Sequence, residues 1–152
     1  MLKRIHPIAG IVAFLTILTF WTSTVVAELL LPIGAVVAVK QAIPWGLFVL
    51  VPALAVTGAS GFRLGGGSTD PRVLSKKRRM PFIAANGILI LIPAALELSV
   101  LAARGDFGDL FYTIQTIELL AGFVNLVLKT LNIRDGLRLT ARAGHTPALS
   151  VP

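Results

Sequence analysis

Polar residues recur on one face of the apolar segment 110–133, and they are the strongest candidates for chemistry in this sequence. They follow one another at steps of three or four residues, the spacing that places side chains on one stripe of an α-helix. In a membrane such a stripe must face protein or water, because lipid offers no hydrogen-bond partner. The stripe comprises Gln115, Glu118, Gly122, Asn125 and Lys129.

Two earlier apolar segments carry charges that suit the same interior. Glu97 lies in the apolar segment 81–103 and Lys40 in the apolar segment 35–58. Counting about 1.5 Å per residue from each segment centre places Lys40, Glu97 and Glu118 at similar depths. A lone charge there costs about 2.5–3.5 kcal/mol on insertion scales. We therefore expect the three side chains to converge inside the molecule, with Lys40 paired to one glutamate.

Amides form a second expected layer, nearer the opposite side of the membrane. Asn86 and Asn125 project from stripes on neighbouring segments, so we expect them to approach each other or a shared partner. Such interhelical hydrogen bonds contribute about 0.6–2 kcal/mol each. Two roles stay open for the buried polar residues: a pathway for ions, or structural pairing between helices. The candidates are Lys40, Asn86, Glu97, Gln115, Glu118 and Asn125.

Conventional catalytic apparatus is missing from the sequence. The chain has no cysteine, which excludes thiolate metal sites and cysteine nucleophiles. The phosphate-loop, zinc-protease and serine-hydrolase motifs are also absent. We therefore predict no catalytic residue and no metal site, and favour a non-enzymatic protein.

His6 is the one candidate cofactor ligand. A bis-histidine haem b needs two imidazoles at matched depth, and the second histidine, His145, lies beyond the last apolar segment. His6 is thus either a polar residue at the start of a helix or the single protein ligand of a haem, which another subunit could share.

The composition points to a membrane environment. Hydrophobic residues make up 55% of the 152 residues and charged residues 14%, whereas soluble domains carry about 25% charge. About 20 consecutive apolar residues cross a bilayer core. Four runs reach this length and predict spans over 7–31, 35–58, 81–103 and 110–133.

Basic residues predict the orientation of these spans. Of the 14 Lys and Arg residues, all but Lys40 and Arg104 lie near the start of the first or third span or the end of the second or fourth. Positively charged flanks stay in the cytoplasm. We predict an all-α membrane protein, an antiparallel bundle of four transmembrane helices, with one membrane domain over 1–152 and both termini cytoplasmic.

The connections divide into two kinds. Those around 32–34 and 104–109 are short enough to form hairpins. The stretch 59–80 is rich in glycine and basic residues, which predicts a mobile cytoplasmic linker. The stretch 134–152 is predicted to be a cytoplasmic tail.

Three short stretches resemble a family of small four-span bacterial membrane proteins to which no activity is attached. They are KRIHPIAG at 3–10, RRMPFIAANG at 78–87 and LNIRDGL at 131–137. The resemblance covers nearly the whole chain. It implies four helices in the bacterial inner membrane, and it transfers no functional residue.

These observations favour an accessory or structural subunit, in a homo-oligomer or beside a larger membrane complex. One alternative is a small transporter of protons, cations or solutes that uses Lys40, Glu97 and Glu118. Another is a haem b-binding electron-transfer subunit with His6 as axial ligand.

The expected partners are the lipid bilayer and other membrane proteins. Topology explains the net charge of +7 without a nucleic acid. Anionic lipid is the expected contact of the basic run Lys76, Lys77, Arg78 and Arg79.

Overall fold

Four helical rods form almost all of the chain. The computed structural model describes residues 1–143, apart from the side chains of Lys3, Thr140, Arg142 and Ala143. The first two rods are α1 (Leu2–Leu30) and α2 (Ile33–Leu64). The third rod is continuous through α3 (Pro71–Asn86), the π-helical η1 (Gly87–Leu91) and α4 (Ile92–Arg104), and the fourth is α5 (Asp109–Ala143). The described residues include no strand.

The rods have the length and surface of membrane helices. All four are long and apolar enough to cross a bilayer. Large apolar side chains point outward along them, with Phe48 76% exposed and Phe82 71% exposed. Water would make so large an apolar surface costly, whereas a bilayer covers it. The architecture is that of a multi-pass helical membrane protein.

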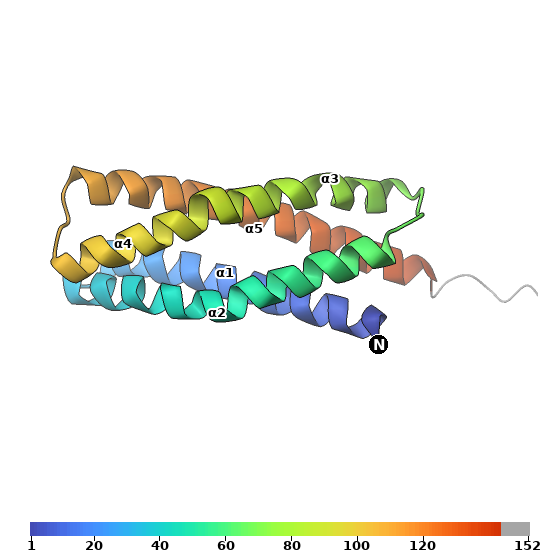
Figure 1. Cartoon of the computed structure of the whole chain (residues 1–152), viewed down its shortest axis with the longest axis horizontal. Helices are drawn as coiled ribbons and strands as arrows, with labels where there is room; N and C mark the ends of the chain where they lie inside the picture. Colours follow the sequence, from blue (N-terminus) through green and yellow to red (C-terminus); the bar gives the residue numbers. More distant parts are fainter. Residues whose placement is uncertain (144–152) are drawn as a thin grey trace, which may run out of the picture.

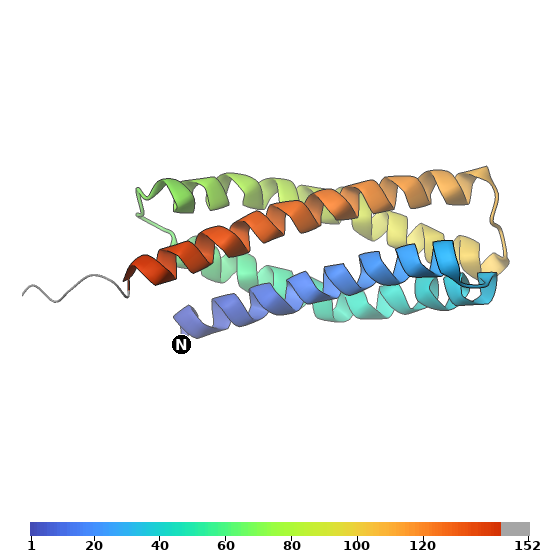
Figure 2. The ribbon, with the colours of Figure 1, turned by 180° about the vertical axis from the view of Figure 1, so that it is seen from behind.

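The rods lie side by side along the long axis, and the chain reverses direction at each connection (Figures 1 and 2). The connections at 31–32 and 105–108 share one end of the molecule, which we call the hairpin end. The N-terminus, the connection at 65–70 and the last turns of α5 share the other, which we call the terminal end.

The predicted linker over 59–80 is wrong for most of its length, because helix replaces it. Helix α2 continues to Leu64 and α3 begins at Pro71, so only residues 65–70 connect them. Asp70 caps α3 by accepting a hydrogen bond from the backbone N–H of Arg72 at 2.8 Å. Proline fits the first helical turn. Because a helix satisfies its own backbone, both rods can extend past their apolar segments without a core of their own.

Helix α5 also extends beyond its predicted span. It continues through residues 134–143, where the sequence predicts a tail. Arg79 of α3 supports this extension through an ion pair with Asp135 at 2.7 Å. The predicted tail residues 144–152 lie outside the described residues.

The prolines act differently on their helices. Pro44 and Pro52 lie within α2, which stays continuous around them. Pro93 lies two residues after the end of η1. At that end the N–H of Ile92 bonds to the carbonyl of Gly87, five residues earlier. Proline clashes with the carbonyl four residues before it, and a widened π turn accommodates that clash. The π turn inserts one residue and rotates the rest of the rod.

Small residues let the rods approach at the middle of the bundle. Buried Ala13 and Ile17 of α1, Leu50 of α2 and Leu126 of α5 form an apolar cluster there. Gly122 of α5 lies under Trp21, and a Cβ atom at this position would be 3.1 Å from the indole. The indole N–H bonds to the carbonyl of Leu119 at 3.0 Å. This apolar layer separates the polar groups of the two ends.

Candidate functional site

An ion pair crosses the interior near the hairpin end. Lys40 Nζ of α2 is 2.6 Å from Glu118 Oε2 of α5, and the two side chains are 1% and 12% exposed. Helix α2 packs chiefly on α1 and α4, whereas α5 packs on α1, α3 and α4. The pair therefore links two helices that are not main neighbours. The predicted pairing of Lys40 with a glutamate is confirmed, with Glu118 as the partner.

Further polar groups gather around this pair. Thr24, Lys40 and Gln115 come from three helices, lie six or seven residues from the hairpin end of each, and are at most 3% exposed. Neither polar atom of the Gln115 side chain has a hydrogen-bond partner. A buried amide without a partner costs about 1–3 kcal/mol. This polar layer therefore contains an amide whose two polar atoms are free to form further hydrogen bonds.

Glu28 adds a second carboxylate to this layer. It lies near the end of α1, within electrostatic range of both Lys40 and Glu118. Its Oε1 atom is buried and has no hydrogen-bond partner. We call Glu28, Lys40, Gln115 and Glu118 the hairpin-end cluster. When ionised, it holds two negative charges against one positive charge.

Glu28 was not among the residues that the sequence predicts for this site. The two-residue connection between α1 and α2 could have indicated the position of Glu28, because so short a turn fixes which residues of the two helices face each other. That tight turn sets the register in which Phe20 faces Gly46 and His6 faces Ser60. The same register places Glu28 within one helical turn of Lys40.

The prediction that Glu97 joins the interior site is wrong. Glu97 is exposed on α4, whereas its neighbour Leu98 is completely buried. The prediction extended the stripe of Asn86 through a regular helix. Because η1 inserts an extra residue, the interior face of α4 falls on Leu98. Glu97 is turned by about 100° toward the outside.

The amide layer forms as predicted, at the level of the apolar layer, since Asn125 lies between Gly122 and Leu126 on α5. Asn86 Nδ2 donates to Asn125 Oδ1 at 3.0 Å and to the carbonyl of Ala121 at 2.8 Å. Asn125 Nδ2 donates to the carbonyl of Ile83 at 3.4 Å. The two amides thus join the third rod to α5 through one hydrogen bond between their side chains and two bonds to backbone carbonyls.

His6 lies near the terminal end in a polar contact between α1 and α2. Its Nδ1 atom is 3.0 Å from Ser60 Oγ, and the Ser60 hydroxyl donates to the carbonyl of Val56. Because the hydroxyl proton of Ser60 is used by Val56, Nδ1 is assigned as the donor to Ser60. His145 lies outside the described residues. Among residues 1–143, no group of three His, Cys, Asp or Glu side chains is placed to hold a metal ion.

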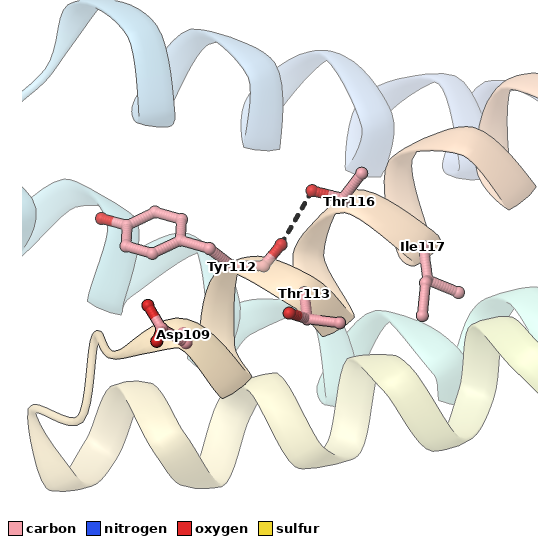
Figure 3. A pocket seen from close by; sticks show the side chains of 5 residues that line it. All are labelled: Asp109, Tyr112, Thr113, Thr116 and Ile117. Atoms are coloured by element: carbon pink, nitrogen blue, oxygen red, sulfur yellow. Dashed lines mark hydrogen bonds between the residues drawn. The ribbon is translucent and has the colours of Figure 1, made fainter.

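A shallow depression of about 520 Å³ lies on the surface of α5 (Figure 3). Its walls come from a single helix, and one threonine hydroxyl is already used by the carbonyl of Tyr112, at 2.8 Å. All of its residues are exposed. Lys40 and Gln115 of the hairpin-end cluster are buried, in contrast to these residues, so the cluster remains the candidate site. The depression is lined by Asp109, Tyr112, Thr113, Thr116 and Ile117.

No family model matches this chain, and no curated protein or solved structure matches it either. Its function must therefore be inferred from the arrangement of its own residues.

Removing Lys40 tests whether the ion pair supports the bundle. We expect Lys40→Met to lower the free energy of unfolding by about 3 kcal/mol, because Glu118 is left buried without its cation. The double variant Lys40→Met/Glu118→Gln should recover at least about 1 kcal/mol of that loss. Unfolding of the purified protein in detergent measures both values. Arg78→Met, on the exposed surface of α3, is the control and should change stability by less than about 0.5 kcal/mol. Strict additivity in the double variant would contradict this role.

Proposed function

We propose that this chain is a multi-pass protein of the bacterial inner membrane that acts as a non-enzymatic accessory or structural subunit. In this proposal it assembles with further copies of itself or with a larger membrane complex. Little of residues 1–143 lies outside the four rods. Its contribution would therefore come from the surface of the bundle and from the few groups inside it.

Charge supports an orientation with both termini in the cytoplasm. The terminal end carries 12 of the 14 basic residues, and only Lys40 and Arg104 belong to the hairpin end. Basic residues near spans are retained on the cytoplasmic side. The run from Lys76 to Arg79 would then meet anionic lipid, at about 1 kcal/mol per residue near the surface.

The observation that carries the proposal of assembly is the position of Glu97. Its carboxylate is exposed on the outside of α4, seven residues from the end of that helix at Arg104. Among the described residues it forms no ion pair. A charge facing lipid at this depth, about 10 Å from the helix end, is costly. A protein partner that supplies a cation or a hydrogen-bond donor would remove the cost.

A transporter of protons or cations is the second candidate, and the stripe on α5 favours it. Gln115, Glu118, Asn125 and Lys129 are all turned inward along this helix. The stripe is interrupted at Gly122, where Trp21 packs. Transport would require this apolar layer to open. The haem alternative, through His6, stays a prediction that an absorption spectrum with or without a Soret band decides.

Cysteine labelling tests the orientation in a chain that has no native cysteine. We expect Ser68→Cys, in the connection at 65–70, to be protected from a membrane-impermeant reagent in intact cells. Asp106→Cys, in the connection at 105–108, should be labelled. The reverse pattern would contradict the proposed orientation, and labelling after lysis controls for reactivity.

Replacing Glu97 tests assembly. We expect Glu97→Leu to weaken association by about tenfold or more, because removal of a polar contact between membrane helices costs about 1–2 kcal/mol. Crosslinking in membranes, followed by sizing in mild detergent, measures the change. Leu96→Ala on the same exposed face is the control. Identical assembly of wild type and Glu97→Leu would remove the main support for this function.

Flux measurements distinguish the second candidate. In proteoliposomes with a pH gradient, a relay predicts proton flux that Glu118→Gln abolishes and that Glu97→Gln leaves unchanged, since only Glu118 lies in the interior. Absence of flux in the wild type would eliminate transport of protons and leave the accessory function in place.

A further inference from the structure

Gln41 is a second polar residue that the bundle exposes at the depth of the membrane. It lies eight residues from the start of α2 at Ile33, about 12 Å along the helix axis. Its side chain is exposed and forms no hydrogen bond within residues 1–143. Lipid offers an amide no partner, so such a position is costly. Gln41 therefore needs a protein neighbour, as Glu97 does.

Gln41 lines a shallow depression on the outside of the bundle, where α2 lies beside α4. The depression has a volume of about 350 Å³, and its other walls are Pro44, Trp45 and Phe48 of α2 and Ser99 of α4. Trp45 is 75% exposed, although it lies twelve residues into α2, about 18 Å from the start of the helix. Tryptophan concentrates at membrane–water interfaces and in contacts between proteins. Because Trp45 is far from the interface, a protein contact explains its position.

Glu97 lies at the same depth as this depression, on the opposite flank of α4. It precedes Ser99 by two residues, which is about 3 Å along the helix and about 200° around it. Ser99 borders the depression, so Glu97 points away from it on the other side of the helix. The chain thus exposes a hydrogen-bond acceptor and a donor, Glu97 and Gln41, on two flanks where they do not meet.

A two-fold axis along the membrane normal brings these groups together. Two copies inserted in the same direction keep equal depths about such an axis. One flank of α4 in the first copy then faces the opposite flank in the second, and each contact occurs twice. Glu97 of each copy therefore meets the depression of the other copy, where Gln41 offers its amide N–H.

We propose that two copies of this chain pair through α2 and α4, with the Glu97 carboxylate of each copy accepting a hydrogen bond from the partner's Gln41. This inference rests on the proposed function, because it names a second copy as the partner in the assembly. The pair satisfies four polar groups that lipid would leave without partners. A different protein would have to supply both a donor and an acceptor, whereas a second copy already carries them at the required depth.

Aromatic side chains support the same contact. Trp45 and Phe48 lie side by side along the depression, with ring centroids 6.1 Å apart. Both rings are at least 75% exposed. Aromatic residues are enriched where proteins meet, and the partner's α4 would cover these rings as it enters the depression.

Crosslinking tests the contact, because the chain has no native cysteine. We expect Ser99→Cys, which leaves Glu97 and Gln41 in place, to form covalent dimers in membranes on oxidation with copper phenanthroline. The two-fold axis passes beside the depression that Ser99 lines. Thr22→Cys is the matched control and should not crosslink. Thr22 is exposed at similar depth, eight residues from the end of α1 at Leu30, and α1 is not a main neighbour of α4.

Variants of the pair, made together with Ser99→Cys, test the donor and the acceptor. We expect Gln41→Leu to lower the yield of covalent dimer by about tenfold or more, as Glu97→Leu does, because the interhelical hydrogen bond is lost. The double variant should lose little more than either single variant. The exchange Gln41→Glu/Glu97→Gln again sets a donor opposite an acceptor, and it should recover the yield to within about threefold of the parent.

Three results would overturn the proposal. A wild type that is a single copy in mild detergent and in membranes would do so, and the proposed function would then require a different protein as partner. Assembly of the wild type, with no more crosslinking in Ser99→Cys than in Thr22→Cys, would refute this contact alone. An exchange variant no better than Gln41→Leu would refute the pair, because a general loss of packing is not rescued by exchanging the two groups.

Discussion

A hydrocarbon surrounding offers polar side chains no hydrogen-bond partner, so each polar group in these helices must be satisfied by another part of the protein. Three such contacts determine how the rods meet. Lys40 reaches Glu118 across the interior, Asn86 and Asn125 join the third rod to α5, and the Trp21 indole bonds to the α5 backbone. Helix α5 takes part in all three. It therefore acts as the central element of the bundle, although every rod has similar length and hydropathy.

The same constraint explains why the groups left unsatisfied are informative. Gln115 and Glu28 keep buried polar atoms without partners beside an ion pair. Such groups are costly to a structure that needs only to pack. The bundle thus has a cluster with two carboxylates near the hairpin end, and in the terminal half the side chain of Lys129 is only 7% exposed. The apolar layer of Trp21 and Gly122 lies between them.

A single proline has a large effect on the outer surface. The π turn of η1 accommodates Pro93, and the extra residue rotates α4 so that Leu98 fills the core and Glu97 faces outward. With a regular helix, Glu97 would have lain nearer Lys40 and competed with Glu118. The rotation therefore leaves one glutamate paired inside and turns the other into a charge available to a partner.

Composition and periodicity by themselves determined the helical class, the four apolar rods and the inward stripe on α5, because these depend on local hydrophobicity and the 3.6-residue repeat. They also predicted that Asn86 would meet Asn125, since a polar group in lipid has few alternatives. The tertiary structure decided which glutamate pairs with Lys40, because that depends on the rotation of α4 by a π turn that no spacing rule reveals. The structure also showed that residues 59–64 and 71–80 are helical. Asp70 caps the start of α3, and Arg79 of α3 pairs with Asp135 of α5. The burial of the Lys129 side chain could be found only from the structure. In the sequence, a basic residue near the end of a span has the pattern of an interfacial anchor, and its exposure depends on the helices packed around it.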